Sequence, residues 1–400
     1  MNIFNSATEL LVSICIIGFG VIFSIIIGGF FSVKKWRAFV IYIWHTIFSL
    51  VYMWYAVSFG GDSLDYFYKS NSSWSNFNFG TFAVVFFTSF LAQIVGLSLL
   101  GCFLVFNLFG VVGLLAFDGC LQAVGKNANI KRLSTLIIFL PSVSFWSSAI
   151  GKDSISFMAV GLALWAALHL KRRLGLMAFA VVAMLFVRPH MAGMMVIALA
   201  IAALLESRAS LPKKVLIGAL SASVAAVMVP FALTYAGVED VVDVDSVSAY
   251  IDTRQSYNME GGGGIDIASM SLPEQLFAYM FRPFIFEINS FFSAAAAFDN
   301  LILFFLFLAG GWAMLKGKRS DLGENRAFMW VYSLMAWGIL AMTTANMGIA
   351  LRQKWMFAPM LIFLFISVIG RRKQIPYVWQ PVNNDVYASS FYESHQHRQR

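Results

Sequence analysis

Two carboxylates lie in the first long polar stretch of the sequence, Gly60-Gly61-Asp62-Ser63-Leu64-Asp65-Tyr66. This stretch follows two long apolar segments, so in a membrane protein it would lie at one face of the bilayer. A carboxylate there can take a proton from an attacking hydroxyl group, and a tyrosine ring beside it can stack on a sugar. The same residues could instead form an Asx-type turn with solvated carboxylates. Spacing leaves both interpretations open, and it leaves either Asp62 or Asp65 as the base.

Basic residues at the ends of later apolar segments form a second group of candidates. They are Lys152, Arg188, Arg282, Arg352 and Lys354, all on the side of the membrane that the charge pattern below makes external. Single bases at a boundary can snorkel or cap a helix, but their recurrence at several connections favours a shared role. Arginine forks bind phosphate oxygens in pairs. We therefore predict that Arg188, Arg282 and Arg352 converge to hold a lipid-linked phosphate or pyrophosphate.

Four further residues adjoin these groups and are candidates for substrate binding: Tyr66, Asp153, His190 and Glu287. Asp153 could equally pair with Lys152 or cap a helix. No cysteine or histidine spacing is typical of a metal site, so no metal and no cofactor is predicted. The acidic stretch 237–272 could bind a cation or a glycan, although a solvated lid fits its composition as well.

Composition indicates what kind of scaffold positions these residues. The chain has 400 residues, of which 60% are hydrophobic and 12% charged, and its mean hydropathy is +0.76. Soluble domains have about 45–50% apolar and about 25% charged residues. The net charge of +8 comes mostly from bases at the ends of apolar segments. This pattern favours anionic lipid headgroups as partners and excludes nucleic acid.

Apolar segments of about 20 residues, with Lys/Arg-rich loops kept inside, predict an all-α polytopic bundle of about 11 spans. The N-terminus then lies outside and the C-terminus in the cytoplasm. The expected spans are residues 10–32, 38–59, 98–122, 133–150, 154–170, 174–187, 191–205, 215–236, 301–315, 327–345 and 355–369. Residues 82–95 are expected to form a short helix at the external surface, and residues 273–300 an interfacial segment after the external loop 237–272. Residues 1–370 would form one transmembrane domain, and residues 371–400 a polar cytoplasmic tail.

Several short motifs of the sequence resemble those of bacterial exopolysaccharide and O-antigen polymerase-like proteins, within the GT-C superfamily of polytopic glycosyltransferases. The motifs are Asp62-Ser-Leu-Asp-Tyr66, Pro141-Ser-Val-Ser-Phe-Trp-Ser-Ser-Ala-Ile-Gly-Lys-Asp153, Phe281-Arg-Pro-Phe284 with Glu287, and Leu351-Arg352. The resemblance covers most of residues 10–370. It implies a polyprenyl-linked sugar donor and a glycan acceptor on the periplasmic side of a bacterial inner membrane. It also implies that the loop acid is the general base and that the arginines hold the pyrophosphate.

The resulting prediction is a membrane glycosyltransferase, a polysaccharide polymerase that works with other polysaccharide assembly proteins. One alternative is a GT-C transferase that uses a polyprenyl-monophosphate sugar. The other is a transporter or flippase of lipid-linked glycans. A flippase would carry charges near mid-membrane and paired broken helices, whereas the candidate residues here gather at one face.

Overall fold

The computed structural model describes residues 6–72, 77–124, 127–206, 269–318 and 325–370, with the separate positions 223, 226, 264, 266, 267 and 320. These residues form helices and their connections, and the described part of the chain has no strand beyond one isolated bridge between Gly264 and Asn346. The all-α prediction is confirmed for this part. Most of the expected span 215–236, most of the loop 237–272 and all of the tail 371–400 lie outside the described residues.

The first third of the chain contains three long apolar helices with two shorter ones between them. These helices are α1 (Ala7–Phe30), α2 (Lys35–Phe59), α3 (Asp62–Ser72), α4 (Thr81–Ser89), which continues as a π-helical turn (Phe90–Ile94), and α5 (Leu99–Val124). At 1.5 Å per residue, α1, α2 and α5 are each long enough to cross the apolar core of a bilayer, about 30 Å thick. They correspond to the expected spans 10–32, 38–59 and 98–122. The stretch 82–95 is a short helix, as predicted.

The middle of the chain departs from the predicted pattern. Its helices are α6 (Ala128–Ile138), α7 (Pro141–Ser147), α8 (Lys152–Ala167), α9 (Leu174–Val187) and α10 (Pro189–Glu206). The prediction of one span over 133–150 is wrong, because α6 ends at Ile138 and α7 is a separate helix of seven residues that starts at Pro141. A bend of 116° then separates α7 from α8. Proline lacks an N–H and disfavours helical geometry in the residue before it. Leu140 is accordingly extended, with φ −61° and ψ 130°.

The last third of the chain also departs from the predicted pattern. Its helices are α13 (Leu272–Phe281), α14 (Phe291–Leu315), α15 (Arg326–Thr343), α16 (Met347–Gln353) and α17 (Ala358–Ile369). The interfacial segment expected at 273–300 ends early, because 291–300 is the start of the 25-residue helix α14. Asp299 and Asn300, which directly precede the expected span 301–315, are both hydrogen-bonded inside the bundle. Asp299 accepts a bond from the Ser142 amide at 2.6 Å, and Asn300 donates one to the Pro283 carbonyl at 3.2 Å.

In the described residues, four helices are long and apolar enough to cross a membrane, and six such spans result if each bent helix pair counts as one. One bent pair is α7 with α8, at 116°, and the other is α16 with α17, at 61°. Many large apolar side chains of α1 and α14 are exposed, as in helices that face lipid. The chain is therefore a multi-pass membrane protein.

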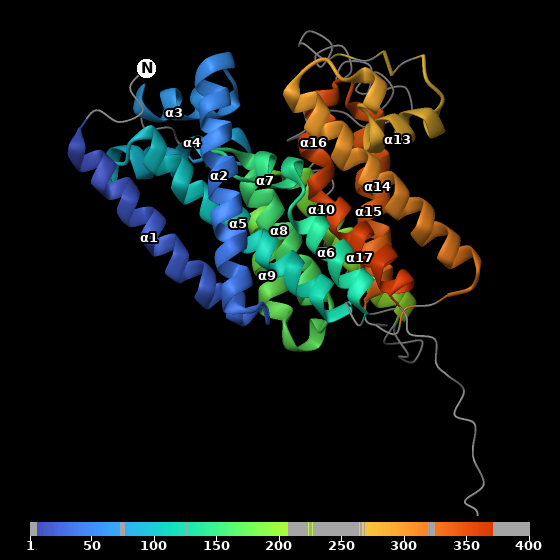
Figure 1. Cartoon of the computed structure of the whole chain (residues 1–400). Helices are drawn as coiled ribbons and strands as arrows, with labels where there is room; N and C mark the ends of the chain where they lie inside the picture. Colours follow the sequence, from blue (N-terminus) through green and yellow to red (C-terminus); the bar gives the residue numbers. More distant parts are fainter. Residues whose placement is uncertain are drawn as a thin grey trace, which may run out of the picture.

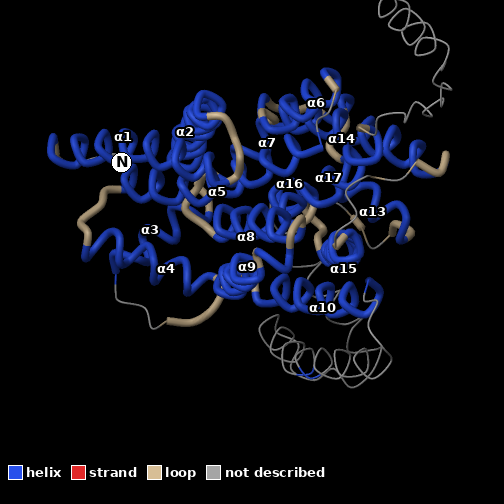
Figure 2. The backbone as a smooth tube through the Cα atoms, turned by 90° about the horizontal axis from the view of Figure 1, so that it is seen from below, coloured by secondary structure: helices blue, strands red, loops and turns tan. Residues whose placement is uncertain are grey.

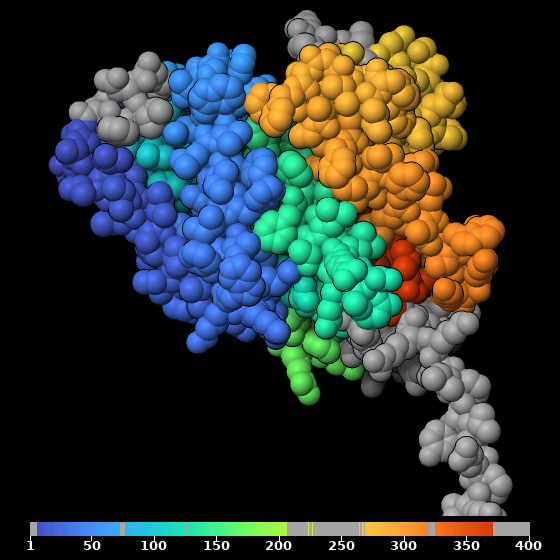
Figure 3. Space-filling view, viewed as in Figure 1, coloured from blue at the N-terminus to red at the C-terminus, as the bar shows by residue number. Residues whose placement is uncertain are grey.

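The helices lie in one bundle, with two ends that differ in structure. In Figure 1 the short helices α3, α4, α7, α13 and α16 gather in the upper part, while the α1–α2 turn and the α8–α9 connection lie at the bottom. Seen from below, α8 lies near the centre, between the α1–α2 side and the α13–α15 side (Figure 2). The N-terminal and C-terminal thirds pack against this middle part (Figure 3). Two clusters of buried apolar side chains fill the bundle, and the smaller one, which includes Tyr52 and Tyr66, lies among α2, α3, α5 and α7.

Candidate functional site

A cavity of about 610 Å³ lies at the end of the bundle where the short helices meet. Helices α3, α8, α10, α15 and α16 contribute to its wall, together with the α9–α10 junction. Five charged residues line it: Asp62, Lys152, Asp153, Arg188 and Arg352. Apolar residues of α10 and α15 line it as well, among them Met194, Ile197, Met335, Ile339 and Leu340. Such a space suits an amphipathic molecule with an anionic group.

Asp62 is the first residue of α3, directly after two glycines. Gly60 and Gly61 have φ values of 81° and 155°, in the region that other residues rarely adopt, and this lets the chain turn sharply from α2 into α3. The next residue, Ser63, donates a hydrogen bond of 2.7 Å to the Ile150 carbonyl. This bond fixes the start of α3 against the bend between α7 and α8. A carboxylate in the first turn is also favoured by the helix dipole.

The bend between α7 and α8 brings Lys152 and Asp153 to the cavity. Besides Ser63, residues of α2 hold this bend: Ser49 donates to the Ser148 carbonyl at 3.0 Å, and a ring nitrogen of His45 lies 2.9 Å from the Ser147 hydroxyl. Lys152 then starts α8, and its ammonium group donates to the Thr81 hydroxyl at 3.2 Å.

Arg188 and Arg352 come from two other places in the chain. Arg188 is the single residue between α9 and α10, and His190 follows it in the first turn of α10. Both residues line the cavity. Arg352 lies in the last turn of α16, where a cation is favoured by the helix dipole. Because α16 is separated from α3 by most of the sequence, only the tertiary fold brings Arg352 next to Asp62.

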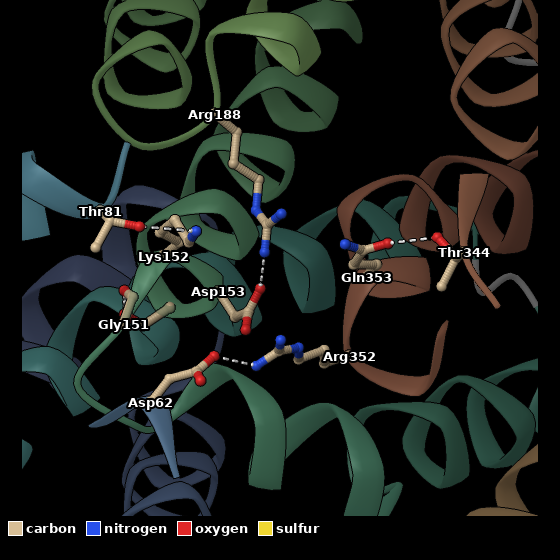
Figure 4. A network of polar contacts seen from close by, with 10 residues as sticks. Asp62, Thr81, Gly151, Lys152, Asp153, Arg188, Thr344, Arg352 and Gln353 are labelled. Atoms are coloured by element: carbon tan, nitrogen blue, oxygen red, sulfur yellow. Dashed lines mark hydrogen bonds and ion pairs between the residues drawn. The ribbon is translucent and has the colours of Figure 1, made fainter. Parts of the chain in front are cut away.

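Two ion pairs lie side by side in the cavity (Figure 4). Arg188 Nη2 lies 2.5 Å from Asp153 Oδ1, and Arg352 Nη1 lies 2.7 Å from Asp62 Oδ2. Their exposure differs. The side chains of Arg188 and Asp153 are 8% and 18% exposed, whereas that of Asp62 is 51% exposed. The first pair is thus enclosed by protein, and the second faces open space.

No family model, curated protein or solved structure matches this chain. The chemistry of the site is therefore read from its own geometry.

Tyr66 lies one turn after Asp62 on α3 and also lines the cavity. Burial raises the pKa of its phenol, and the nearby charges of Asp62 and Asp153 raise it further. The phenol therefore stays neutral at ordinary pH and can act as a hydrogen-bond donor rather than as a base. Tyr52 and Trp146 complete this side of the wall, with their rings 5.8 Å apart in edge-to-face contact.

Four of the predicted site residues do not line the cavity. Asp65 is exposed on α3 and is not among the residues that line the cavity. Arg282 forms an ion pair with Glu287 instead of joining Arg188 and Arg352. Burial acts to raise the pKa of Glu287, but bonds from Arg282 and the Phe284 amide outweigh it and lower the pKa. Glu287 is thus held as the carboxylate that neutralises Arg282.

Lys354 is the fourth of these residues. Its side chain is fully buried, and its ammonium group donates a hydrogen bond to Asn300 Oδ1. Asn300 and its neighbour Asp299 in turn bond to the Pro283 carbonyl and to the amide at the start of α7. Lys354 therefore ties α14 to the segment between α16 and α17, and its charge does not reach the cavity.

Sequence reasoning missed the uncharged residues of the wall. Thr81 accepts from Lys152, and Thr344 donates to Gln353 at 3.2 Å (Figure 4). Tyr52 and Trp146 were also missed. Uncharged residues in a chain this rich in aromatics carry no distinguishing signal, so only the fold could identify them.

Proposed function

We propose that this chain is a membrane glycosyltransferase that joins sugars carried on a polyprenyl phosphate or pyrophosphate, as a polysaccharide polymerase does. The observation that supports this proposal is the make-up of one cavity wall. There a half-exposed carboxylate, Asp62, and the cations Arg188, Arg352 and Lys152 line the same cavity as apolar side chains of α10 and α15. An acid, a group of cations and an apolar surface are what a sugar donor with a phosphate and a lipid chain requires.

In the proposed reaction, Asp62 takes the proton of an acceptor hydroxyl group as that oxygen forms a bond to the anomeric carbon of the donor. The bond from the anomeric carbon to the phosphate oxygen breaks, and its electron pair stays on that oxygen. Arg188 and Arg352 stabilise the negative charge that develops there. Asp153 orients Arg188 through their 2.5 Å contact. Tyr66 and His190 line the space that the sugars would occupy.

The proposal includes an orientation in the membrane. The α1–α2 turn and the α8–α9 connection carry the bases Lys34, Lys35, Lys171 and Arg172, at the end of the bundle opposite the short helices (Figure 1). Bases of this kind remain cytoplasmic. The cavity would then open on the external, periplasmic side of a bacterial inner membrane, with the N-terminus outside and the C-terminus inside. A glycan acceptor and other polysaccharide assembly proteins would be its partners. The total of about 11 spans stays a prediction.

The substitution Asp62→Asn tests the proposed chemistry, because it keeps the size of the side chain and removes the proton acceptor. Loss of a general base typically lowers the rate by about a hundredfold to ten-thousandfold. The control is Asp65→Asn on the same helix, which should retain normal activity because Asp65 lies outside the cavity wall. The measurement is polymer formed from a polyprenyl-linked donor by purified protein in liposomes. Near-normal polymer formation by the Asp62 variant would exclude Asp62 as the base.

A transporter or flippase of lipid-linked glycans is the second candidate, and one observation favours it. Two bent helix pairs, α7–α8 and α16–α17, contribute charged residues at or near their bends. Broken helices that meet at a binding site are typical of transporters. The same liposomes separate the two functions: a flippase moves the glycan across the membrane without forming a glycosidic bond, and a transferase produces a longer glycan.

A further inference from the structure

The cavity contains two arginine–carboxylate pairs that differ in how firmly they are held. Arg188 and Asp153 are enclosed by protein, with side chains that are 8% and 18% exposed. Asp62 is 51% exposed, and the bond to its Oδ2 comes from Arg352 Nη1. The Arg352 side chain is 24% exposed, so this pair is half-open at Asp62 only. A pair with a half-exposed partner contributes less free energy than an enclosed pair, which is costly to break. The Asp62–Arg352 pair is therefore the weaker one.

A third pair shows what a fixed arginine–carboxylate contact looks like in this protein. At the other end of the bundle, Arg37 holds Asp118 through two parallel bonds of 2.7 Å each, from Nε and Nη2. Its Nη1 donates to Thr135 at 3.0 Å. In the cavity, Nε of Arg352 is buried and has no acceptor among the described residues, and the same holds for Nε of Arg188. Arg352 is thus incompletely bonded by Asp62, and a tetrahedral oxyanion could bond it more fully.

Separation of Asp62 from Arg352 does not require a change in the backbone. The bond from Ser63 to the Ile150 carbonyl anchors the start of α3. The Asp62 side chain, half exposed to the cavity side, can turn to another rotamer while the helix stays in place. Exposed side chains change rotamer within picoseconds to nanoseconds, so the exchange is fast compared with catalysis.

We infer that Asp62 is an internal counter-ion that competes with the ligand for Arg352. It pairs with Arg352 in this structure and gives way when a phosphate-type anion binds there. The inference deepens the proposed function and rests on it for the class of ligand, a phosphate or pyrophosphate group. A carboxylate that leaves its cation takes up a proton more readily. Binding of the donor would thereby release the base at the moment when the acceptor needs it.

The test measures binding of inorganic pyrophosphate to the purified full-length protein in detergent, by calorimetric titration. Asp62→Asn removes the competing charge, so it should bind pyrophosphate about two- to tenfold more tightly than the wild type. Asp65→Asn removes an equal charge from the same helix outside the cavity and should bind like the wild type. An Asp62 variant that binds no tighter than the wild type, or more weakly, would overturn the inference.

A double-mutant cycle tests whether the gain in affinity for pyrophosphate depends on Arg352. In an Arg352→Gln background, the further change Asp62→Asn should give no gain in affinity, because the contested cation is gone. An equal gain in both backgrounds would mean a general charge effect and would also overturn the inference. This assay contains no sugar. A protein that transfers no sugar but shows the gain at Asp62 would reject the proposed function and retain the inference.

Discussion

Three arginine–carboxylate pairs of the same chemistry differ in what they do because they differ in burial. Asp118 is fully buried and is held by Arg37 through two bonds, which fastens α2 to α5. The Arg188–Asp153 pair is nearly enclosed and orients a cation toward the cavity. Asp62, which pairs with Arg352, is half exposed and has room to move. We propose that the first pair contributes to structure, the second to structure and binding, and the third to binding and, through Asp62, to proton transfer.

This ranking predicts a difference in stability between two alanine variants. Asp153→Ala leaves the nearly buried Arg188 without its partner, which should cost about 3–5 kcal/mol of unfolding free energy. Asp62→Ala removes an exposed partner and should cost less than about 1 kcal/mol. Chemical denaturation of the purified variants in the same detergent measures both values. Equal losses would contradict the ranking by burial.

At the residue scale, the sequence predicted part of the site for a physical reason. Bases at the ends of apolar segments are costly to place, and Arg188 and Arg352 do lie at the cavity. The same signal marked Arg282 and Lys354, which bond to Glu287 and Asn300 instead. Whether such a base faces a cavity or a buried partner depends on helices far apart in the sequence, and spacing does not carry that information.

At the scale of elements, close approach between helices depends on glycine at several contacts, and the contact between α5 and α8 is one of them. Helix α8 packs against α5, and a Cβ built at Gly161 would lie 2.5 Å from the Gly113 carbonyl oxygen. That distance is too short for any carbon, and the atom it meets belongs to the backbone, which cannot turn away. Both helices lie below the cavity, and α8 carries Lys152 and Asp153 at its start.

The substitution Gly161→Ala should therefore force α8 away from α5 and destabilise the protein by about 1–3 kcal/mol or more. Gly175→Ala is the control. It lies in the first turn of α9, where an added Cβ meets nothing within 4 Å, so its effect should be neutral or slightly stabilising. The measurement compares the two variants by heating each in detergent and then quantifying the remaining folded protein by size-exclusion chromatography. A stable Gly161 variant would mean that the two helices pack less closely than described.

Elements that cross the bundle as single long helices were predicted well, and the bent ones were not. Helices α1, α2 and α5 are long uninterrupted apolar runs, so hydropathy suffices to find them. Pro141 was a visible signal for a break, but the apolar residues around it suggested a continuous span. Asp299 and Asn300 lie within α14 because neighbouring groups hydrogen-bond to both side chains, and bonded polar residues of this kind are tolerated inside a bundle.

At the scale of the whole molecule, the proposed orientation can be tested by labelling with a membrane-impermeant maleimide. The exposed Cys15 is first changed to serine, since the other two cysteines are buried. A cysteine at Ser72, the end of α3, should then react in intact cells, because it lies near the cavity end. A cysteine at Lys171, in the α8–α9 connection, should react only after lysis. The reverse pattern would invert the orientation.

The all-helical class followed from composition alone, because a chain with this share of apolar residues can satisfy its backbone in a membrane as helices. The number of spans did not follow in the same way. The count treated most apolar runs as crossings, including those that form α6 with α7 and α9, whereas α6, α7 and α9 have 11, 7 and 14 residues. The cavity itself is a property of the packed bundle, since no single segment contains it.

The two cavity pairs also differ in when they can form during synthesis. Asp153 and Arg188 are separated by 35 residues, and Asp62 and Arg352 by 290. A ribosome delivers the chain from the N-terminus at about 5–20 residues per second. Asp153 therefore meets its partner within seconds, while Asp62 waits until nearly the whole chain has emerged. A nascent chain that stops before α16 can therefore form the Arg188–Asp153 pair but not the Asp62–Arg352 pair, so the cavity is completed last.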